Sequence, residues 1–209
     1  MNNCEEFNCP GLEIQISELK EALRCFIYTI LFNRAIGGNR AVDPFTVRSP
    51  LFDLAYAKVE APEVDLQVEE RIKAFGEAAE KAPGQPMMLL LSFYTETAKE
   101  SGIFWQVFSA KKTEKVYFER WKLPINITQS RPVSAGDDDS VRSSAVSASQ
   151  VKSLLWFVLR KVGEKMDHLP PSSLTPIYPC DITYDKQKSD SAWSPRSLAS
   201  SIKSLPYIT

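Results

Sequence analysis

The segment that most constrains the fold begins near the N-terminus, at Ser17, and ends before Gly37 and Gly38. Apolar residues recur there at helical spacing and also lie on the other sides of the cylinder: Leu19, Ala22, Leu23, Cys25, Phe26, Ile27, Tyr28, Ile30, Leu31 and Phe32. A helix that is apolar on more than one side must be covered on more than one side. We therefore predict a central helix, capped by the Ser17 hydroxyl, against which the other elements pack.

The other patterns along the chain predict an α+β domain. Alternating or continuous apolar runs predict strands at 12–16, 51–59, 87–94, 115–127 and 177–184. Apolar stripes predict two more helices, at about 64–81 and 147–167. Residues 39–50 read as a connection. Pro124 lacks the N–H that a ladder needs, so it should mark a bulge or an edge of the sheet.

Composition sets the expected boundaries. Residues 128–149 are dominated by Ser, Ala, Asp and Val and include three consecutive aspartates at 137–139, so we expect a disordered insert. Residues 1–11 are expected to be an N-terminal tail, and residues 186–209 a flexible C-terminal tail. Between them, residues 12–185 should form a single domain.

Charge and hydropathy exclude several function classes. The chain has 25 Lys and Arg residues against 26 Asp and Glu residues, so there is no basic excess to neutralise phosphates, and we expect no nucleic-acid partner. The first residues lack a basic start and an apolar core, and no apolar run approaches the roughly 20 residues of a membrane span. A cytoplasmic protein is expected, with membrane association indirect at most.

The sequence offers little catalytic chemistry. Its four cysteines fit neither a zinc half-site nor a disulfide framework, and the single histidine, His168, follows a helix whose end carbonyls it should contact. We therefore expect no enzyme, no cofactor and no metal. A cysteine-dependent enzyme with Cys25 or Cys180 as nucleophile is the least favoured alternative.

Two groups of aromatic residues lack an obvious place in the core. Phe104, Trp105 and Phe108 lie in a predicted loop between two strands. Trp156 and Phe157 lie off the apolar stripe of the last helix, a stripe assigned to Val151, Leu154, Leu155, Val158, Leu159, Val162 and Met166. Either these rings anchor partners, or they are covered by their own chain: Trp105 by the sheet, and Trp156 and Phe157 by the insert or the C-terminal segment.

Five segments together resemble the autophagy-related protein 101 family: "ISELKEALRCFIYTILFNRA", "PLFDLAYAKV", "LSFYTE", "KVYFERWKLPINI" and "FVLRKVGEKMDHLPP". The resemblance covers about residues 12–185 without the insert. It implies a HORMA-like domain, with three helices packed on a mostly antiparallel β-sheet and a mobile C-terminal β segment.

The resemblance also implies a function. Members of this family are non-catalytic adaptors that pair with the HORMA domain of autophagy-related protein 13 in the autophagy-initiation kinase complex. They stabilise that partner and recruit downstream factors to the preautophagosomal structure. Their protruding aromatic loop, the WF finger, corresponds here to Trp105 with Phe104 or Phe108.

The resemblance implies a second partner surface on the last predicted helix, which pairs with the other HORMA domain. Trp156, Phe157 and Arg160 are the candidate contact residues there. A peptide-clasping HORMA adaptor of a checkpoint or DNA-repair pathway remains the alternative.

Overall fold

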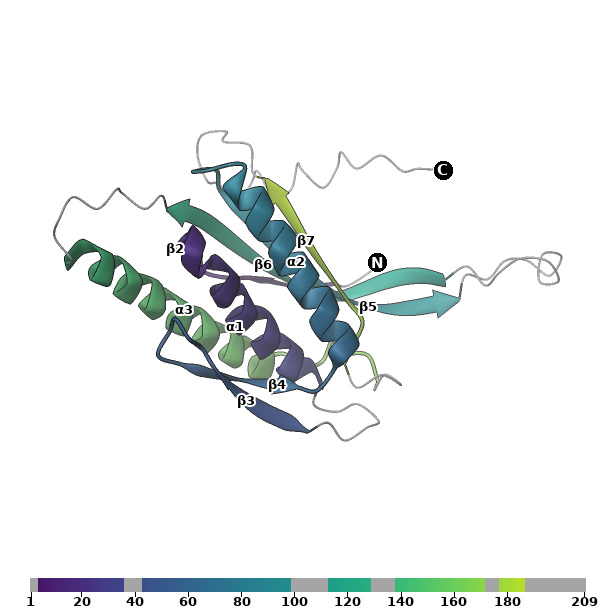
Figure 1. Cartoon of the computed structure of the whole chain (residues 1–209). Coiled ribbons are helices and arrows are strands. Elements are labelled where there is room, and N and C mark those ends of the chain that lie inside the picture. Colours follow the sequence, from purple (N-terminus) through teal and green to yellow (C-terminus); the bar gives the residue numbers. More distant parts are fainter. Residues whose placement is uncertain (1–3, 36–42, 99–112, 129–137, 172–176, 187–209) are drawn as a thin grey trace.

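The computed structural model describes residues 4–35, 43–98, 113–128, 138–171 and 177–186 (Figure 1). The predicted central helix is α1, Ile16–Ala35, which is buried along most of its length. The helices α2, Pro62–Glu80, and α3, Asp138–Glu164, lie on either side of it. In the part of the chain that the structure describes, no helix is both long and apolar enough to cross a membrane.

The three helices pack on one face of a five-stranded sheet. The strands are β1 (Glu5–Asn8), β2 (Leu12–Gln15), β5 (Met87–Ala98), β6 (Thr113–Thr128) and β7 (Cys180–Lys186), in the order β1-β6-β5-β7, with β2 also on β6. The β5–β6 and β5–β7 pairs are antiparallel, whereas β1 and β2 run parallel to β6. The predicted α+β class and mostly antiparallel sheet are confirmed, and the sheet is mixed.

The core lies between the helices and the inward face of the sheet. Trp121, Leu123 and Ile125 of β6 are fully buried there, with Leu89 and Leu91 of the neighbouring strand β5 beside them. The alternation along each strand places these side chains on the same face. Both strands are central in the sheet.

Pro124 lies in central strand β6 rather than at an edge, which corrects the expectation from sequence. The carbonyl of Lys122 accepts a hydrogen bond from the Cys9 N–H (2.9 Å), so even-numbered residues of β6 direct their backbone groups toward β1 and β2. The nitrogen of Pro124 has no hydrogen to donate, and it therefore faces the chain between those two strands, near Gly11. A central proline is tolerated because no ladder bond is needed at that point.

Three further segments differ from the sequence prediction. Residues 5–8 of the expected tail form β1, residues 44–48 of the expected connection form β3 (Pro44–Arg48), and α3 starts at Asp138, inside the expected insert. Strand β3 pairs with β4 (Ala55–Val59) in a separate two-stranded sheet beside α1. These segments are short or polar, so tertiary packing and not local pattern determines them. Residues 129–137 of the expected insert, and the tail from residue 187, lie outside the described residues.

Candidate partner-binding surface

Helix α3 has one buried and one exposed face. Its buried line consists of Val151, Leu154, Val158 and Val162, which face the core. The opposite face carries Trp156, which is 73% exposed, and Leu159, which is 44% exposed. Leu159 and the exposed Met166 were predicted to belong to the core stripe, and the structure corrects this. The exposed side of the helix therefore carries the large apolar side chains of Trp156 and Leu159 among polar ones.

The three predicted surface residues of α3 are not equivalent. Trp156 and Arg160 are one helical turn apart and lie together on the exposed face. Phe157 is half-buried and packs against the hydrophobic core. Its ring therefore contributes mainly to the core. Of the two aromatic residues, only Trp156 exposes most of its side chain to a partner.

Positive charge borders this exposed face. Arg160 and Lys161 both form ion pairs with Glu164, and Lys165 forms one with Glu5 of β1 at 2.8 Å. Lys152 is exposed one turn before Trp156. The three cations at the end of α3 are thus already paired with carboxylates, whereas Lys152 forms no ion pair with any residue that the structure describes.

Gly163 leaves space on the same face. It follows Trp156 by two helical turns, and a Cβ atom placed there would meet no atom within 4 Å. Without a side chain, the helix backbone is open to close approach by another element. Trp156 and Gly163 therefore offer a projecting ring beside a flat surface, a shape suited to a partner helix.

The predicted aromatic loop lies outside the described residues, and with it Phe104, Trp105 and Phe108. Its two stems are described: Ala98 at the end of β5 pairs with Thr113 at the start of β6. This ribbon extends away from the helices (Figure 1). Ala98 and Thr113, which flank residues 99–112, therefore lie together at the tip of a projecting β-ribbon.

A buried ionic cluster lies at the core of the domain. Arg34 of α1 donates from Nε to both carboxylate oxygens of Glu119 in β6, at 2.9 Å each, and both side chains are buried. The Trp121 indole also donates to this carboxylate, and His168 Nε2 lies 2.6 Å from Glu119 Oε2. Burial alone would raise the pKa of Glu119, but the hydrogen bonds from His168, Arg34 and Trp121 and the Arg34 charge outweigh it, and the pKa is lowered.

The cluster is structural, and sequence reasoning missed it. His168 was expected to contact the end of the preceding helix, but it contacts the carboxylate of Glu119 instead. The Phe7 ring stacks on Trp121 at 4.2 Å and meets His168 edge-on, so strands, helices and the segment after α3 converge here. One signal was present: Glu119 lies in phase with the buried residues of β6.

The structure disfavours cysteine chemistry. Burial raises the pKa of both Cys25 and Cys180 to about 12, so neither thiol would ionise readily at neutral pH. The imidazole of His168 is already engaged by Glu119. Among the described residues, no three side chains of the ligand types His, Cys, Asp and Glu are grouped so that they could hold a metal ion.

A groove of about 340 Å³ lies between α1 and α2, and its lining is charged. Arg24 on its α1 side is held by Glu69 of α2 through two hydrogen bonds, at 2.9 and 2.7 Å. Arg24 and Glu69 therefore satisfy each other, and the described residues that line the groove expose no large apolar side chain to a partner, so it is a weaker candidate than the α3 face.

Comparisons with known proteins agree with the resemblance. A family model described as "Autophagy-related protein 101" matches residues 11–175. A relative from Arabidopsis thaliana, named "Autophagy-related protein 101", is 30% identical over 207 residues, covering 91% of this chain and 91% of the relative. The family match begins after β1 and includes all three helices.

Proposed function

The chain belongs to the autophagy-related protein 101 family, and from this premise we propose that it is a non-catalytic adaptor of autophagy initiation. It pairs through the exposed face of α3 with the HORMA domain of autophagy-related protein 13, within the complex that carries the initiation kinase. It stabilises that partner and recruits downstream factors from the cytoplasm to the preautophagosomal structure.

The exposed Trp156 is the single observation that carries the pairing proposal. A tryptophan offers a large contact area on few rotatable bonds, and such residues dominate binding energy at interfaces. Leu159 extends the apolar centre, whereas Lys152 and Arg160 provide a charged rim. An interface built in this way buries an aromatic anchor and leaves its charges at the edge.

Recruitment is assigned to the aromatic loop. The described part of the β5–β6 ribbon projects away from the helices (Figure 1). This supports the proposal that a partner binds at the tip of the ribbon while α3 is occupied. We place Trp105 at its centre, with Phe104 or Phe108 as the second aromatic.

Coexpression with the HORMA domain of autophagy-related protein 13 tests the pairing. We expect the two proteins to coelute on size exclusion, and Trp156→Glu to weaken binding at least tenfold, since loss of a central aromatic anchor costs about 2 kcal/mol or more. Leu66→Glu is the matched control, because Leu66 is 65% exposed on a different helix, α2. Separate elution of the wild-type proteins would refute the proposal, and equal effects of the two variants would refute the assignment to α3.

Recruitment is tested separately with Trp105→Ala. This variant should keep the pairing and the melting temperature of the wild type but bring fewer downstream factors to the preautophagosomal structure in cells, measured by fluorescence colocalisation. A large loss of thermal stability would instead place Trp105 in the core.

A further inference from the structure

A β-bulge in the long ribbon decides which residues lie on the outer face of the sheet, the face opposite the helices. Phe93 of β5 pairs with Glu119 of β6, but the next residue, Tyr94, pairs with Tyr117. Phe118 is therefore the extra residue, and beyond it the side chains of β6 exchange faces. Without the bulge, Tyr117 would point into the core in phase with Glu119.

The bulge brings Tyr117 and Lys115 to the face on which β7 presents Asp181. Asp181 pairs with Ser92 of β5, whose neighbours Phe93 and Leu91 are buried on the helix side. Strand β5 separates β7 from β6 in the sheet. The carboxylate of Asp181 thus reaches across an intervening strand, past the small side chain of Ser92, to contact β6.

The contacts of Asp181 are specific. Lys115 Nζ donates to both carboxylate oxygens at 2.9 Å, and the Tyr117 hydroxyl donates to Oδ2 at 2.7 Å. The Lys115 ammonium also lies 4.2 Å from the centre of the Tyr94 ring, which fixes its position. These three donor contacts satisfy the carboxylate in one arrangement.

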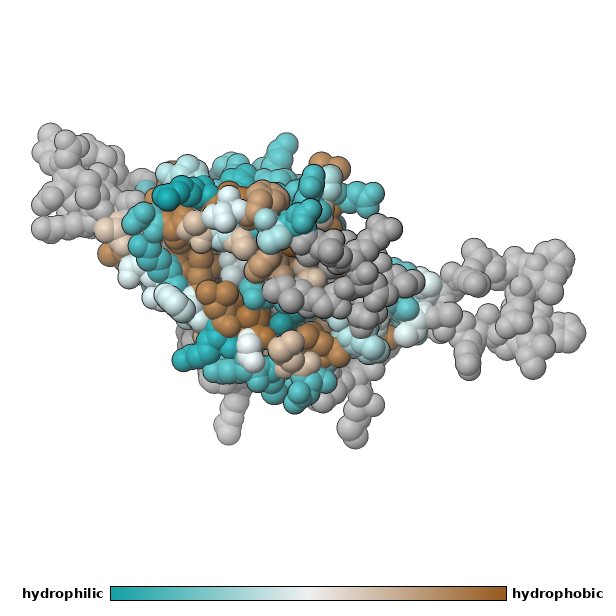
Figure 2. Space-filling model, turned by 90° about the horizontal axis from the view of Figure 1, so that it is seen from below, coloured by the Kyte–Doolittle hydropathy of each residue, from teal (hydrophilic) through white to brown (hydrophobic). Residues whose placement is uncertain are grey.

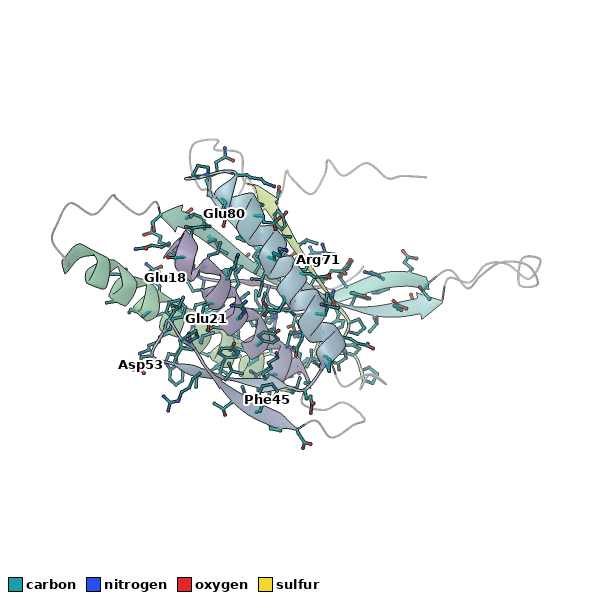
Figure 3. The ribbon with its side chains drawn as sticks, viewed as in Figure 1. Glu18, Glu21, Phe45, Asp53, Arg71 and Glu80 are labelled. Carbon is teal, nitrogen blue, oxygen red and sulfur yellow. The ribbon has the colours of Figure 1, made fainter. Side chains whose placement is uncertain are left out.

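Other charged groups also surround the cluster. Arg120 of β6 lies 5.7 Å from the Tyr117 ring centre, but its guanidinium donates to Ser92 and Glu6. Arg71 lies on the side of α2 that faces the β5–β6 ribbon (Figure 3) and adds positive charge near Asp181. Burial raises the pKa of Asp181, but its hydrogen bonds with Lys115 and Tyr117 and the charges of Lys115 and Arg71 outweigh burial, and the pKa is lowered.

Besides the contacts of Asp181, strand β7 is held by one ladder, by the buried side chains of Cys180 and Ile182, and by two contacts with α2. It is an edge strand, bonded along one side to β5. On the helix side, Gln67 of α2 donates to the Cys180 carbonyl at 3.0 Å, and Phe75 meets Tyr184 edge-on at 5.4 Å. An edge strand with one ladder opens at lower free energy than the centre of a sheet.

We propose that Lys115, Tyr117 and Asp181 form an electrostatic latch that stabilises β7 on the sheet, so that loss of the Asp181 charge makes β7 open more often without unfolding the domain. The bulge in β6 builds the latch, since it alone turns Tyr117 and Lys115 toward β7. Opening of β7 breaks its ladder with β5 and its contacts with α2, whereas the pairing of β5 with β6 does not involve β7.

Hydrogen exchange of the full chain tests the latch. Asp181→Asn removes the charge and keeps the size, and we expect the amides of residues 180–186 to lose protection about fivefold at pH 6.5, as for a charge-assisted surface contact. Peptides from α1 should exchange at the wild-type rate. Tyr117→Phe should give a smaller loss at the same residues.

Asp185→Asn is the matched control, because Asp185 is exposed on the same strand and face and forms no ion pair with any residue that the structure describes. It should leave the exchange of residues 180–186 unchanged. An equal effect of the two asparagine variants, an unchanged β7 in Asp181→Asn, or an equal loss of protection in α1 would each overturn the proposal.

Alkylation of Cys180 gives an independent measurement. Cys180 is buried at the start of β7, and Cys25 is buried in α1. In Tyr117→Phe, which leaves the Asp181 charge beside Cys180 in place, the rate of alkylation of Cys180 relative to that of Cys25, followed by mass spectrometry at neutral pH, should rise by the same factor as the loss of protection at residues 180–186. A constant ratio would contradict the opening of β7.

Discussion

At the centre of the domain, a single charged residue contributes more to stability than its sequence pattern indicates. Glu119 is fully buried and accepts hydrogen bonds from Arg34 and Trp121, with His168 in contact. A buried carboxylate is stable only while its partners remain, since removing one leaves an unpaired charge. The cluster thus joins α1, β6 and the segment after α3.

Glu119→Gln should therefore destabilise the domain by about 3–5 kcal/mol, because the buried Arg34 guanidinium loses its counter-charge. Urea unfolding followed by circular dichroism measures this free energy of unfolding. The double variant Glu119→Leu/Arg34→Met removes both charges and should recover a large part of the loss. A single variant that unfolds like the wild type would contradict the assigned role of the ion pair.

Among the elements, β1 shows how a segment can be ordered without a strong local signal. Its four residues contain one buried side chain, that of Phe7, which stacks on Trp121. The neighbouring Glu5 and Glu6 are paired with Lys165 and Lys122. The strand is held by what it meets on β6 and after α3, and not by its own propensity.

We expect Phe7→Ala to lower the free energy of unfolding by about 3 kcal/mol, through lost burial and lost ring stacking. Glu5→Ala, on the same strand, should change it by less than about 1 kcal/mol, since exposed ion pairs contribute little. Chemical denaturation of the two variants distinguishes these cases. Wild-type stability for Phe7→Ala would show that residues 1–11 behave as the tail that composition predicted.

On the scale of the whole molecule, the outer surface is chemically uneven. The face on the side of the two-stranded sheet of β3 and β4 shows a band of hydrophobic residues between hydrophilic ones (Figure 2). Phe45 of β3 and Leu51 in the turn before β4 are among the exposed apolar side chains. With Trp156 on α3, they are exposed apolar side chains that could contribute to the assembly proposed above.

Acid should destabilise the whole domain. The pKa values of Glu119 and Asp181 are lowered from ordinary values of 4.5 and 3.8. Their stabilising contribution is therefore complete above these values and is lost as the pH falls through the lowered folded-state values. We expect the free energy of unfolding to fall between pH 5 and pH 3, and to fall less steeply in Glu119→Leu/Arg34→Met. Equal slopes in the two proteins would contradict the lowered pKa of Glu119.

The strongest local patterns were sufficient to predict the main elements. The apolar residues of α1 and the runs in β5 and β6 lie at the spacing that their final structure requires, so their type and approximate bounds could be read directly. For the candidate surface, the position of Trp156 off the core stripe was also readable. The separation of Trp156 from Phe157, and the exposure of Leu159, depend on how closely α3 packs against its neighbours.

The sequence by itself determined the α+β class, the central helix and the family, because these depend on periodicity and on residue order along the chain. Only the tertiary structure decided that Glu119 meets Arg34 and His168, that Pro124 lies opposite the break between β1 and β2, and that Asp181 reaches Lys115 and Tyr117. Each of these contacts joins residues far apart in the chain, and the last depends on a bulge of one residue. The residue pattern of a single segment cannot predict such pairs, because their contacts depend on the register in which the strands pair.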